Sequence, residues 1–573
     1  MPESYTLLIG GIQGEGVVST GLNLMRSLSS LGFYTYGSRR FSSRIKGGNT
    51  SFKISISTKK QLCTQDSVDS LFALDLETIS LYENQLKEGG ILLYDADLAP
   101  SFSKNSSLTY VPVPITQIAK ESGALLMKNT CTIGFIGQLL GISEDDLIPS
   151  IKERYDKKGK QVVEKNLKVL SNSFGYKSDV IDQHKHSLGS KPVPTSRPLM
   201  IGNEAIALGA LMAGCRFIPA YPITPASEIM EYLGSVLPQY GGVMIQVEDE
   251  ISAVTMAIGA SYAGVRSMTA SSGPGLSLML EGISLAGMTE VPIVVVACQR
   301  VGPSTGLPTK HEQSDLFTLY YGGHGEYPSI ILAPSTVEEC FYDTIRAFNL
   351  AEEYQCPVIV LSDLSLSLSP QTVDPLDYDQ VVIQRGAMVT MDTLNHTETN
   401  DFKRFAFTEN GISPRSIPGM KNGSHHVTGV EHSENGIPND NEKNRKKMME
   451  KRMGKTAPLS LGSEIKIIHN NRRSTLFLTM GSNFGIVKEA VESCGNQVDY
   501  GAITMIRPLP RKQLLEVFEK YDRVVIVENN YEGQLAAIIK QEIGYHHKID
   551  QFLKYDGSPF TLESLRDKIG GEA

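Results

Sequence analysis

A threonine between two prolines, Thr224, is a candidate for a chemical role in this sequence. Residues 220–228 read AYPITPASE and end a short apolar run. A residue before proline is excluded from the helical region, so Tyr221 and Thr224 are expected to be extended, while Pro225 suits the first position of a helix. Thr224 is then predicted as the N-cap of that helix, with its hydroxyl near the carboxyl end of a strand, where open α/β sheets bind ligands. A helix cap without any ligand is the simpler interpretation of these residues alone.

An acidic cluster at the end of a second apolar run could offer a carboxyl group to a ligand. Glu248, Asp249 and Glu250 follow IQV and precede a stretch rich in Ala, Gly and Ser that ends at Gly264. Small side chains let a flat ligand or another backbone approach closely, and a carboxyl group there can hydrogen-bond a ring nitrogen. Acids at a helix start are also ordinary partners of the helix dipole. Spacing alone does not rank the three acids.

An arginine follows a third apolar run, PIVVVACQ. Arg300 leads into the Gly/Pro-containing loop VGPSTGLPT, which ends at Thr309. An arginine at the carboxyl end of a strand can bind a carboxylate through two parallel hydrogen bonds. The alternative is a surface salt bridge, which is common and contributes little to stability.

A glycine loop near the N-terminus could bind phosphate. Its glycines are Gly10, Gly11, Gly14 and Gly16, and they lie between an apolar run and an amphipathic helix, whose first N–H groups attract anions. The acid expected about 20 residues further on for NAD binding is absent. That region instead carries Arg39, Arg40, Arg44 and Lys46. The pattern disfavours NAD and favours a ligand with extra phosphates, such as NADP or coenzyme A, although a tight turn beside an exposed basic loop explains these residues equally well.

Alternating apolar runs and helical stretches would position all of these residues. Residues 1–177 begin as strand, turn and helix and predict an α/β domain, and the polar, proline-containing residues 178–196 predict a linker. Between 197 and 376 the alternation continues, which predicts βαβ units around a largely parallel sheet that is buried on both faces. Residues 471–573 alternate in the same way. The fold class is therefore α/β, with three domains.

Residues 377–470 interrupt this alternation. They are poor in apolar periodicity, rich in Gly, Asn, His and charge, and include the basic run EKNRKKMMEKRMGK. The segment is either a disordered linker or an irregular, functional excursion. Composition slightly favours the linker, and the basic run is typical of a solvated helix face.

Composition excludes several classes of protein. The chain has 573 residues, of which 41% are hydrophobic, and this indicates several domains. A net charge of -9 without a long basic stripe argues against nucleic acid as the main partner. The start lacks a signal-peptide pattern, and no stretch reaches the roughly 20 apolar residues of a membrane span, so we expect a cytoplasmic protein that binds no membrane. The seven cysteines are scattered, which predicts no disulfide framework and no self-contained metal or iron–sulfur site.

Taken together, the motifs resemble the alpha subunit of 2-oxoacid:ferredoxin oxidoreductases of the 2-oxoglutarate type, in the form with a gamma domain fused in front. The likeness covers nearly the whole chain, in the family's order. It is carried by GIQGEGVVSTG, SRIKGGNTSF, YPITPASE, DEISAVTMAIGASYAG, TASSGPGLSLM, QRVGPSTGLPT and GISPRSIPGMKNGSHHVTGVEHSENG. The resemblance implies a gamma-type domain at 1–177, a thiamine diphosphate-binding pyrimidine domain at 197–376 and a transketolase C-terminal-like domain at 471–573. We assign the last domain to assembly rather than to chemistry.

The resemblance also implies a reaction and its residues. The family oxidatively decarboxylates 2-oxoglutarate or a related 2-oxo acid with coenzyme A, giving acyl-CoA, carbon dioxide and reduced ferredoxin. Glu250 resembles the glutamate that bonds the pyrimidine nitrogen of thiamine diphosphate. Thr224, Arg300 and Thr309 match the family's substrate site, in which Arg300 would bind a carboxylate and Thr224 a substrate oxygen, while Tyr221 would shape the pocket.

The N-terminal domain would close over coenzyme A, again by resemblance. The contacts that it suggests are Gly14, Gly16, Arg39 and Arg40. The sequence contains no GDG-type diphosphate and magnesium motif and no cysteine cluster. The resemblance therefore implies a beta subunit that carries Mg2+ and a [4Fe-4S] cluster, with ferredoxin as the electron acceptor and one alpha–beta pair or a dimer of pairs as the catalytic unit.

The sequence alone is also compatible with other functions. Pyruvate or a branched-chain 2-oxo acid could be the main substrate. A non-oxidative thiamine diphosphate enzyme acting alone is a further alternative, against which the missing diphosphate motif counts. A regulator that binds NADP or coenzyme A through the glycine loop would leave the second domain unexplained.

Overall fold

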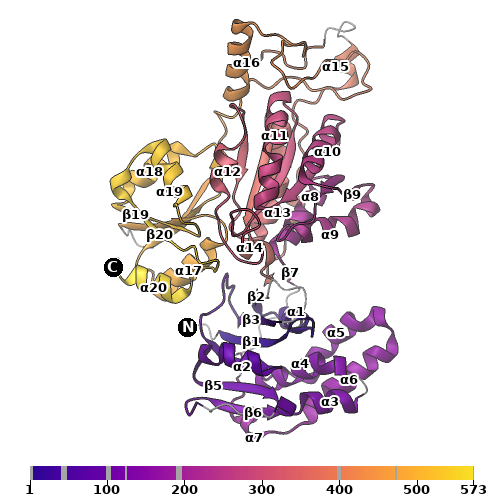
Figure 1. Cartoon of the computed structure of the whole chain (residues 1–573), viewed down its shortest axis with the longest axis vertical. Helices are drawn as coiled ribbons and strands as arrows, with labels where there is room; N and C mark the ends of the chain where they lie inside the picture. Colours follow the sequence, from indigo (N-terminus) through magenta and orange to yellow (C-terminus); the bar gives the residue numbers. More distant parts are fainter. Residues whose placement is uncertain are drawn as a thin grey trace. The chain divides into compact units, whose positions relative to one another are not determined.

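An eight-stranded mixed sheet organises the first of two units into which the chain divides (Figure 1). The computed structural model describes residues 4–40, 48–98, 105–122, 125–186, 188, 197–395, 402–470 and 474–571. The first unit comprises Met1–Met200, Ser369–Pro375 and Thr561–Glu563. From edge to edge its strands are β6 (Thr109–Val113), β5 (Leu86–Asp95), β4 (Val68–Ala73), β1 (Tyr5–Ile12), β3 (Asn49–Ser57), β2 (Tyr34–Arg40), β14 (Gln371–Thr372) and β7 (Leu199–Met200).

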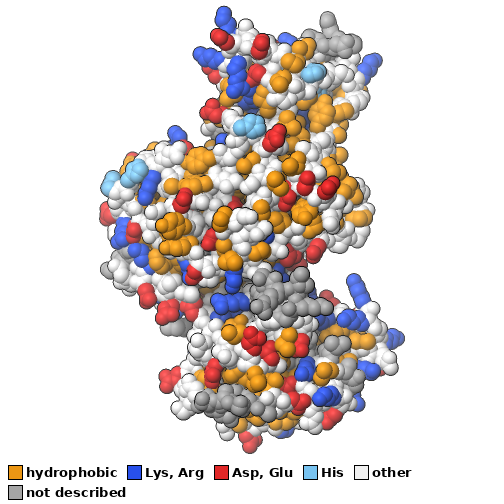
Figure 2. All heavy atoms as spheres, in the orientation of Figure 1, with side chains coloured by type: hydrophobic (Ala, Val, Ile, Leu, Met, Phe, Trp, Pro, Cys, Tyr) orange, Lys and Arg blue, Asp and Glu red, His pale blue; other side chains and the backbone are white. Residues whose placement is uncertain are grey.

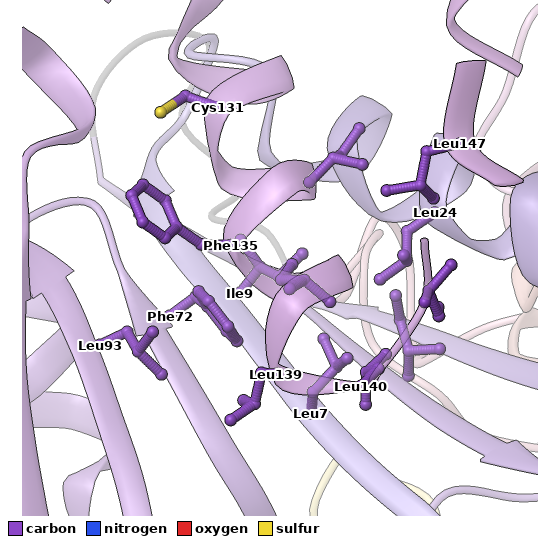
Figure 3. Close-up of a cluster of buried hydrophobic side chains, with 14 of the residues drawn as sticks. Leu7, Ile9, Leu24, Phe72, Leu93, Cys131, Phe135, Leu139, Leu140 and Leu147 are labelled. Atoms are coloured by element: carbon purple, nitrogen blue, oxygen red, sulfur yellow. The ribbon is translucent and has the colours of Figure 1, made fainter. Parts of the chain in front are cut away.

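Helices complete the first unit and supply half of its core. They are α1 (Val17–Ser30), α2 (Leu76–Tyr82), α3 (Ile115–Glu121), α4 (Lys128–Leu139), α5 (Glu144–Tyr155), α6 (Lys160–Gly175) and α7 (Asp179–Gln183). Leu7 and Ile9 from the apolar run of β1, Leu24 of α1 and Phe135 of α4 belong to one buried cluster (Figure 3). Burial of this apolar surface is the main force that holds helices on the sheet.

The expected linker at 178–196 is helical at its start. Ser178 accepts a hydrogen bond from the backbone N–H of Ile181 and so caps α7, and the Ile181 side chain is buried. A single buried residue in a polar stretch gives no periodic signal, so the helix could not be recognised from the sequence. Residues 189–196 lie outside the described part of the chain.

The second unit comprises Ile201–Leu368, Leu376–Phe560 and Ser564–Ala573 and contains three sheets. One pairs β8 (Phe217–Ala220) with β9 (Val243–Gln246). Another has the order β10 (Met268–Ser271), β11 (Ile293–Gln299), β13 (Pro357–Asp363), β12 (Ile330–Leu332) and β18 (Met505–Arg507). The third has the order β15 (Ile465–Ile468), β17 (Asp499–Ile503), β16 (Thr475–Thr479), β19 (Arg523–Glu528) and β20 (Ile549–Leu553).

The strands from β8 to β13 pair with one another only in parallel, which confirms the predicted βαβ organisation. A single parallel bridge between Phe217 and Ser267 connects the two-stranded sheet to the start of β10. The crossover helices are α8 (Gly202–Met212), α9 (Ser227–Val236), α10 (Glu250–Tyr262), α11 (Gly273–Thr289), α12 (Leu316–Tyr321), α13 (Val337–Tyr354) and α14 (Leu364–Leu368). The carboxyl ends of these strands therefore lie along one edge, the position at which α/β folds bind ligands.

The C-terminal α/β region shares a core with this parallel sheet. Its helices are α17 (Asn483–Ser493), α18 (Arg511–Lys520), α19 (Gln534–Ile543) and α20 (Leu562–Gly570). Strand β18 pairs antiparallel with β12, and one buried cluster contains Ile293 and Ile331 together with Met480 and Phe518. The second and third α/β regions therefore share a strand pairing and a core, and they form one compact unit.

Described residues between 376 and 470 form a packed, irregular layer that includes α15 (Met391–Asn395) and α16 (Glu442–Gly454) (Figure 1, top). The side chains of Lys451, Arg452 and Lys455 are buried. Two interpretations are therefore wrong for these residues: the segment is not a linker, and α16 is not only a solvated helix face. The buried cations are tolerated because Glu290 and Glu431 provide carboxylates for them.

Helix α13 is the longest helix of the described residues, with 18 residues. It carries acidic and basic side chains and packs against α8 and the parallel sheet. None of the described helices combines the length and the apolar character that crossing a membrane requires. On the face drawn in Figure 2, acidic and basic side chains are interspersed.

Candidate active site

Burial separates the three acids that the sequence could not rank. Glu248 is exposed, and Asp249 is the N-cap of α10, whose carboxylate accepts a hydrogen bond of 2.7 Å from the Ser252 N–H. Glu250, the first residue of the helix, is only 5% exposed. Asp249 therefore has a structural task, and Glu250 presents a buried carboxyl group at the edge where the parallel strands end.

Glu250 faces the start of the next helix, α11. Among the described residues its carboxylate accepts one hydrogen bond, from Ser271 Oγ over 3.5 Å. Gly275 approaches it so closely that a Cβ atom at that position would overlap with Glu250 Oε1. The neighbouring Ser272 Oγ is buried and has no hydrogen-bond partner within the described chain. A weakly bonded carboxyl beside a glycine and an unsatisfied hydroxyl fits a flat, nitrogen-containing ring.

Thr224 is not a helix N-cap, contrary to the prediction. The Thr224–Pro225 peptide bond is cis, residues 224–226 form a turn, and α9 begins only at Ser227 with Ala226 as its N-cap. The prediction placed Pro225 at the first helical position, whereas the chain turns there and becomes helical two residues later. Asn203 of α8 holds this turn, because its Nδ2 donates a hydrogen bond to the Pro225 carbonyl over 2.5 Å.

Arg300 lies against this turn. It is 5% exposed, and its Nη1 donates to the Thr224 carbonyl over 2.6 Å. Its Nη2 donates to the Thr305 carbonyl over 3.4 Å, and Nε is buried without a partner in the described residues. Burial lowers the pKa of the guanidinium, and the Asp315 carboxylate opposes this shift. The structure thus brings Arg300 and Thr224 together, with N–H groups left over for an anion.

The loop after Arg300 folds back on itself. The Val301 N–H donates to the Lys310 carbonyl over 3.2 Å, and the Lys310 N–H donates to the Leu307 carbonyl over 2.9 Å. These bonds close the loop, so that Thr309, which is half-buried, returns to the base of the loop close to Arg300. Tyr221, which directly follows β8, is 39% exposed at the same sheet edge.

Three residues of this edge gave no signal in the sequence. Asn203 fixes the cis turn, as described above. Asp315 accepts a hydrogen bond from the Gly273 N–H, the first residue of α11, over 3.2 Å. Gln313 binds Asp363 Oδ2 at the end of β13 over 2.9 Å. An isolated Asn, Gln or Asp in a polar stretch has no periodicity, so only their positions in space reveal them.

The glycine loop of the first unit has the predicted context, a strand before it and a helix after it. Gly14 and Gly16 have φ of 97° and 87°, which only glycine adopts easily, and Gly16 is the N-cap of α1. Strands β1 and β2 both run antiparallel to β3, and Gly10 and Arg40 both lie opposite Ser51. The glycine loop and the end of β2 that carries Arg39 and Arg40 therefore lie at the same edge of the sheet.

The other two basic residues of that region, Arg44 and Lys46, lie outside the described residues. Within the described chain no group of three or more His, Cys, Asp or Glu side chains is arranged to hold a metal ion. The seven cysteines are free thiols, and six of them are buried.

Models of three families match successive parts of the chain. Residues 6–176 match pyruvate ferredoxin/flavodoxin oxidoreductase, and residues 208–451 match the thiamine diphosphate-binding region of pyruvate flavodoxin/ferredoxin oxidoreductase. Residues 474–565 match core domain II of pyruvate:ferredoxin oxidoreductase. The second match includes Thr224, Glu250 and Arg300, so the residues of the sheet edge lie within a thiamine diphosphate-binding domain.

Relatives and a solved structure agree with these models. The 2-oxoacid:ferredoxin oxidoreductase subunit alpha of Sulfolobus sp is 33% identical over 98% of this chain and 96% of its own length. The 2-oxoglutarate synthase subunit KorA of Methanothermobacter thermautotrophicus is 37% identical over 64% of this chain and 96% of its own. The structure of 2-oxoglutarate:ferredoxin oxidoreductase from Magnetococcus marinus, with 2-oxoglutarate, coenzyme A and succinyl-CoA bound, covers 100% of this chain and 99% of its own, with 33% identity and a TM-score of 0.91. By sequence and by fold, this chain belongs to the alpha subunits of the 2-oxoacid:ferredoxin oxidoreductases.

Proposed function

We propose that this alpha subunit, together with a beta subunit, oxidatively decarboxylates 2-oxoglutarate. The bond between the carboxylate carbon and the 2-oxo carbon breaks and releases carbon dioxide, two electrons pass one at a time to ferredoxin, and the acyl group forms a thioester with coenzyme A. The observation that carries the proposal is the pairing of Arg300 with Thr224 at the sheet edge that also holds Glu250. The choice of 2-oxoglutarate is supported by the relatives that act on it.

Glu250 is the residue that we assign to the cofactor. Thiamine diphosphate, when bound, supplies a carbon nucleophile for 2-oxo carbons and an electron sink for decarboxylation. The buried Glu250 carboxyl has one long hydrogen bond, so its oxygens are free to hold a proton at a ring nitrogen or to release it. Gly275 lets α11 pack directly against this carboxyl, because the Cβ of any larger residue would overlap with Glu250 Oε1 and displace it.

Arg300 and Thr224 are assigned to the substrate. The two backbone carbonyls that Arg300 binds hold its guanidinium in place, so little entropy is lost when an anion binds. Its remaining N–H groups can bind a substrate carboxylate through charge-assisted hydrogen bonds. The Thr224 hydroxyl is assigned to a substrate oxygen, Thr309 to the wall opposite the cis turn and Tyr221 to the rim.

The remaining assignments follow the family. Gly14, Gly16, Arg39 and Arg40 of the first unit are assigned to coenzyme A, because helix N-termini and arginines bind phosphate. The beta subunit is assigned the Mg2+ and diphosphate site and the [4Fe-4S] cluster that passes electrons to ferredoxin.

The proposal is tested by coexpression with an iron–sulfur beta subunit. We expect the purified pair to reduce a viologen dye only when 2-oxoglutarate, coenzyme A and thiamine diphosphate are all present. A panel of 2-oxo acids then ranks the substrates, and preference for pyruvate or a branched-chain acid would replace 2-oxoglutarate in the proposal. No reduction with any 2-oxo acid would overturn it.

Replacing Arg300 tests the substrate assignment. Arg300→Ala removes the cation that would bind the substrate carboxylate, so the KM for 2-oxoglutarate should rise by about tenfold or more, with a smaller change in kcat. Arg523→Ala is the control, because that side chain is 44% exposed and pairs with Asp550 on the C-terminal sheet. An unchanged KM in Arg300→Ala would show that the substrate carboxylate binds elsewhere.

A further inference from the structure

The segment His311–Phe317, with the sequence HEQSDLF, connects the candidate active site to the C-terminal region. It follows the loop that starts at Arg300 and leads into α12. Its polar residues make two sets of contacts: His311 and Gln313 bind Asn529 and Asn483 of the C-terminal region, and Asp315 binds the start of α11. Nothing in the proposed function so far requires this segment.

The C-terminal side of the contact is a buried hydrogen-bond network around Gln313. Its Nε2 donates to Asp363 Oδ2 over 2.9 Å, and its Oε1 accepts from Asn483 Nδ2 over 2.9 Å. The Gln313 N–H donates to the Asn529 carbonyl over 2.7 Å, and Asn530 Nδ2 donates to the Gln313 carbonyl over 3.1 Å. Every polar group of the Gln313 residue is bonded, and such satisfied buried networks favour a single conformation.

The same region also holds the segment beyond Asp315. Gln534, at the start of α19, accepts a hydrogen bond from the Phe317 N–H over 2.9 Å and donates to the Ser314 carbonyl over 3.0 Å. The sequence motifs GSNFG and VENNYEGQ thus fix the backbone on both sides of Asp315. The C-terminal region therefore does more than assemble the enzyme: it sets the position of one carboxylate.

That carboxylate lies between the two halves of the candidate active site. Asp315 Oδ2 accepts from the Gly273 N–H, and its own N–H donates to Gln299 Oε1 over 3.1 Å, one residue before Arg300. Two residues after Gly273, Gly275 abuts Glu250. The Asp315 carboxylate thus contacts α11, the helix that packs against Glu250, and is attracted to Arg300, the residue assigned to the substrate.

We propose, on the basis of the proposed function, that Asp315 is a positioning residue for the reaction. Its carboxylate holds the amino-terminal turn of α11, and with it Gly275, against Glu250, and it balances the buried charge of Arg300. The N-terminus of a helix favours a negative charge, and an unpaired buried guanidinium is costly, so both contacts call for a carboxylate rather than a neutral group.

Two variants separate the hydrogen bond from the charge. Asp315→Ala removes both, and we expect kcat with 2-oxoglutarate to fall at least about tenfold, because Glu250 loses its support. Asp315→Asn keeps an acceptor for the Gly273 N–H but loses the charge, so its kcat at pH 7 should lie between those of Asp315→Ala and the wild type. The control is Glu312→Gln, a half-buried acid of the same segment that contacts neither Gly273 nor Arg300, and its kcat should match the wild type.

The pH profile supplies a readout that a purely structural role would not change. Burial raises the pKa of Asp315 to about 6, with the Gly273 N–H and Arg300 opposing the shift and Glu312 adding to it. The wild-type kcat should therefore decline below about pH 6, as the carboxylate takes up a proton. Asp315→Asn should lack this decline, and Glu312→Gln should retain it.

The outcomes distinguish this inference from the function on which it rests. Wild-type kcat in Asp315→Ala, or a decline below pH 6 that persists in Asp315→Asn, would overturn the role of Asp315 while the enzyme assignment stands. Should Asp315→Ala fail to assemble with the beta subunit, the pH profile of Asp315→Asn decides alone. A wild-type pair that reduces no viologen with any 2-oxo acid would overturn both.

Discussion

Two glutamates of the second unit are buried to nearly the same degree but have opposite surroundings. Glu290, which follows the last residue of α11, is 0% exposed, and its carboxylate accepts from Lys451 Nζ at 2.7 and 2.9 Å and from Lys455 Nζ at 3.0 Å. Glu250, at the start of α10, is 5% exposed and accepts one hydrogen bond of 3.5 Å. One carboxylate is saturated by cations, and the other is almost unbonded.

The difference shows how a buried acid can be assigned a role without a bound ligand. Around Glu290, burial raises the carboxyl pKa, but the two ammonium groups and Arg404 outweigh it and hold the pKa well below its usual range. That group stays ionised and ties the irregular layer to α11. Among the described residues no ammonium or guanidinium group bonds the Glu250 carboxylate, so its oxygens remain available to a ligand. The first arrangement stabilises structure, and the second is the one that we assign to the cofactor.

Replacing Glu250 is expected to have the largest effect. Glu250→Gln keeps the shape of the side chain but cannot exchange a proton, so kcat should fall by about 100- to 10,000-fold while the subunits still assemble. Viologen reduction and gel filtration of the purified pair measure the two properties. Glu248→Gln, an exposed acid two residues earlier, should behave like the wild type. Normal turnover in Glu250→Gln would show that the catalytic carboxylate was assigned wrongly.

Two glycines give a matched test of the space beside Glu250. In Gly275→Ala the new Cβ would overlap with Ser271 Oγ and Glu250 Oε1, so the carboxyl must move, and kcat should fall by about a hundredfold. In Gly259→Ala, on the exposed face of α10, the Cβ meets nothing within 4 Å, so kcat should not change. Equal activities of the two variants would contradict the close approach of α11 to Glu250.

The Glu290 cluster should affect stability and leave turnover unchanged. Glu290→Gln leaves Lys451 and Lys455 buried without their counter-charge, which should cost about 3–5 kcal/mol of unfolding free energy. Chemical denaturation measures the loss, and kcat of the folded pair should stay within about twofold of the wild type. Glu450→Gln on the same helix, α16, is the control, since its side chain is 65% exposed. Loss of turnover in folded Glu290→Gln would remove the distinction between the two glutamates.

Replacing a third carboxylate, Glu431, is expected to have the smallest effect on stability, and this effect should depend on pH. Burial raises the pKa of Glu431, but hydrogen bonds from Arg452 and Arg445 outweigh it and lower the pKa to about 2. A folded-state pKa below the unfolded value adds stability above about pH 4.5, and that stability is lost as the pH falls toward 2. Glu431→Gln should therefore reduce the unfolding free energy at pH 7 by about 2 kcal/mol, less than at Glu290 because the Glu431 side chain is 14% exposed. The difference from the wild type should shrink at pH 3, and a difference that does not change with pH would refute the ion pair.

The sequence predicts the strand-and-helix alternation well, because parallel strands and their crossover helices leave a periodic apolar pattern. It fails where a single contact decides the conformation. The turn over residues 224–226 delays the start of α9 to Ser227, and the buried lysines of α16 depend on one glutamate far away in sequence. Glu250 could be preferred over its two neighbours only by resemblance, since burial, which separates them, is a property of the fold.

The short strand β14 shows why the N-terminal unit cannot simply be cut from the chain. After α14 the chain pairs Gln371 with Tyr36 of β2 and with Met200 of β7, and then leaves the sheet again. A truncated chain that ends at residue 177 would lack both β7 and β14 and would expose the edge of β2 to pairing with other molecules. A test of the proposed coenzyme A site in this unit alone therefore requires a rejoined chain, in which residues 369–375 are linked back to the N-terminal segment.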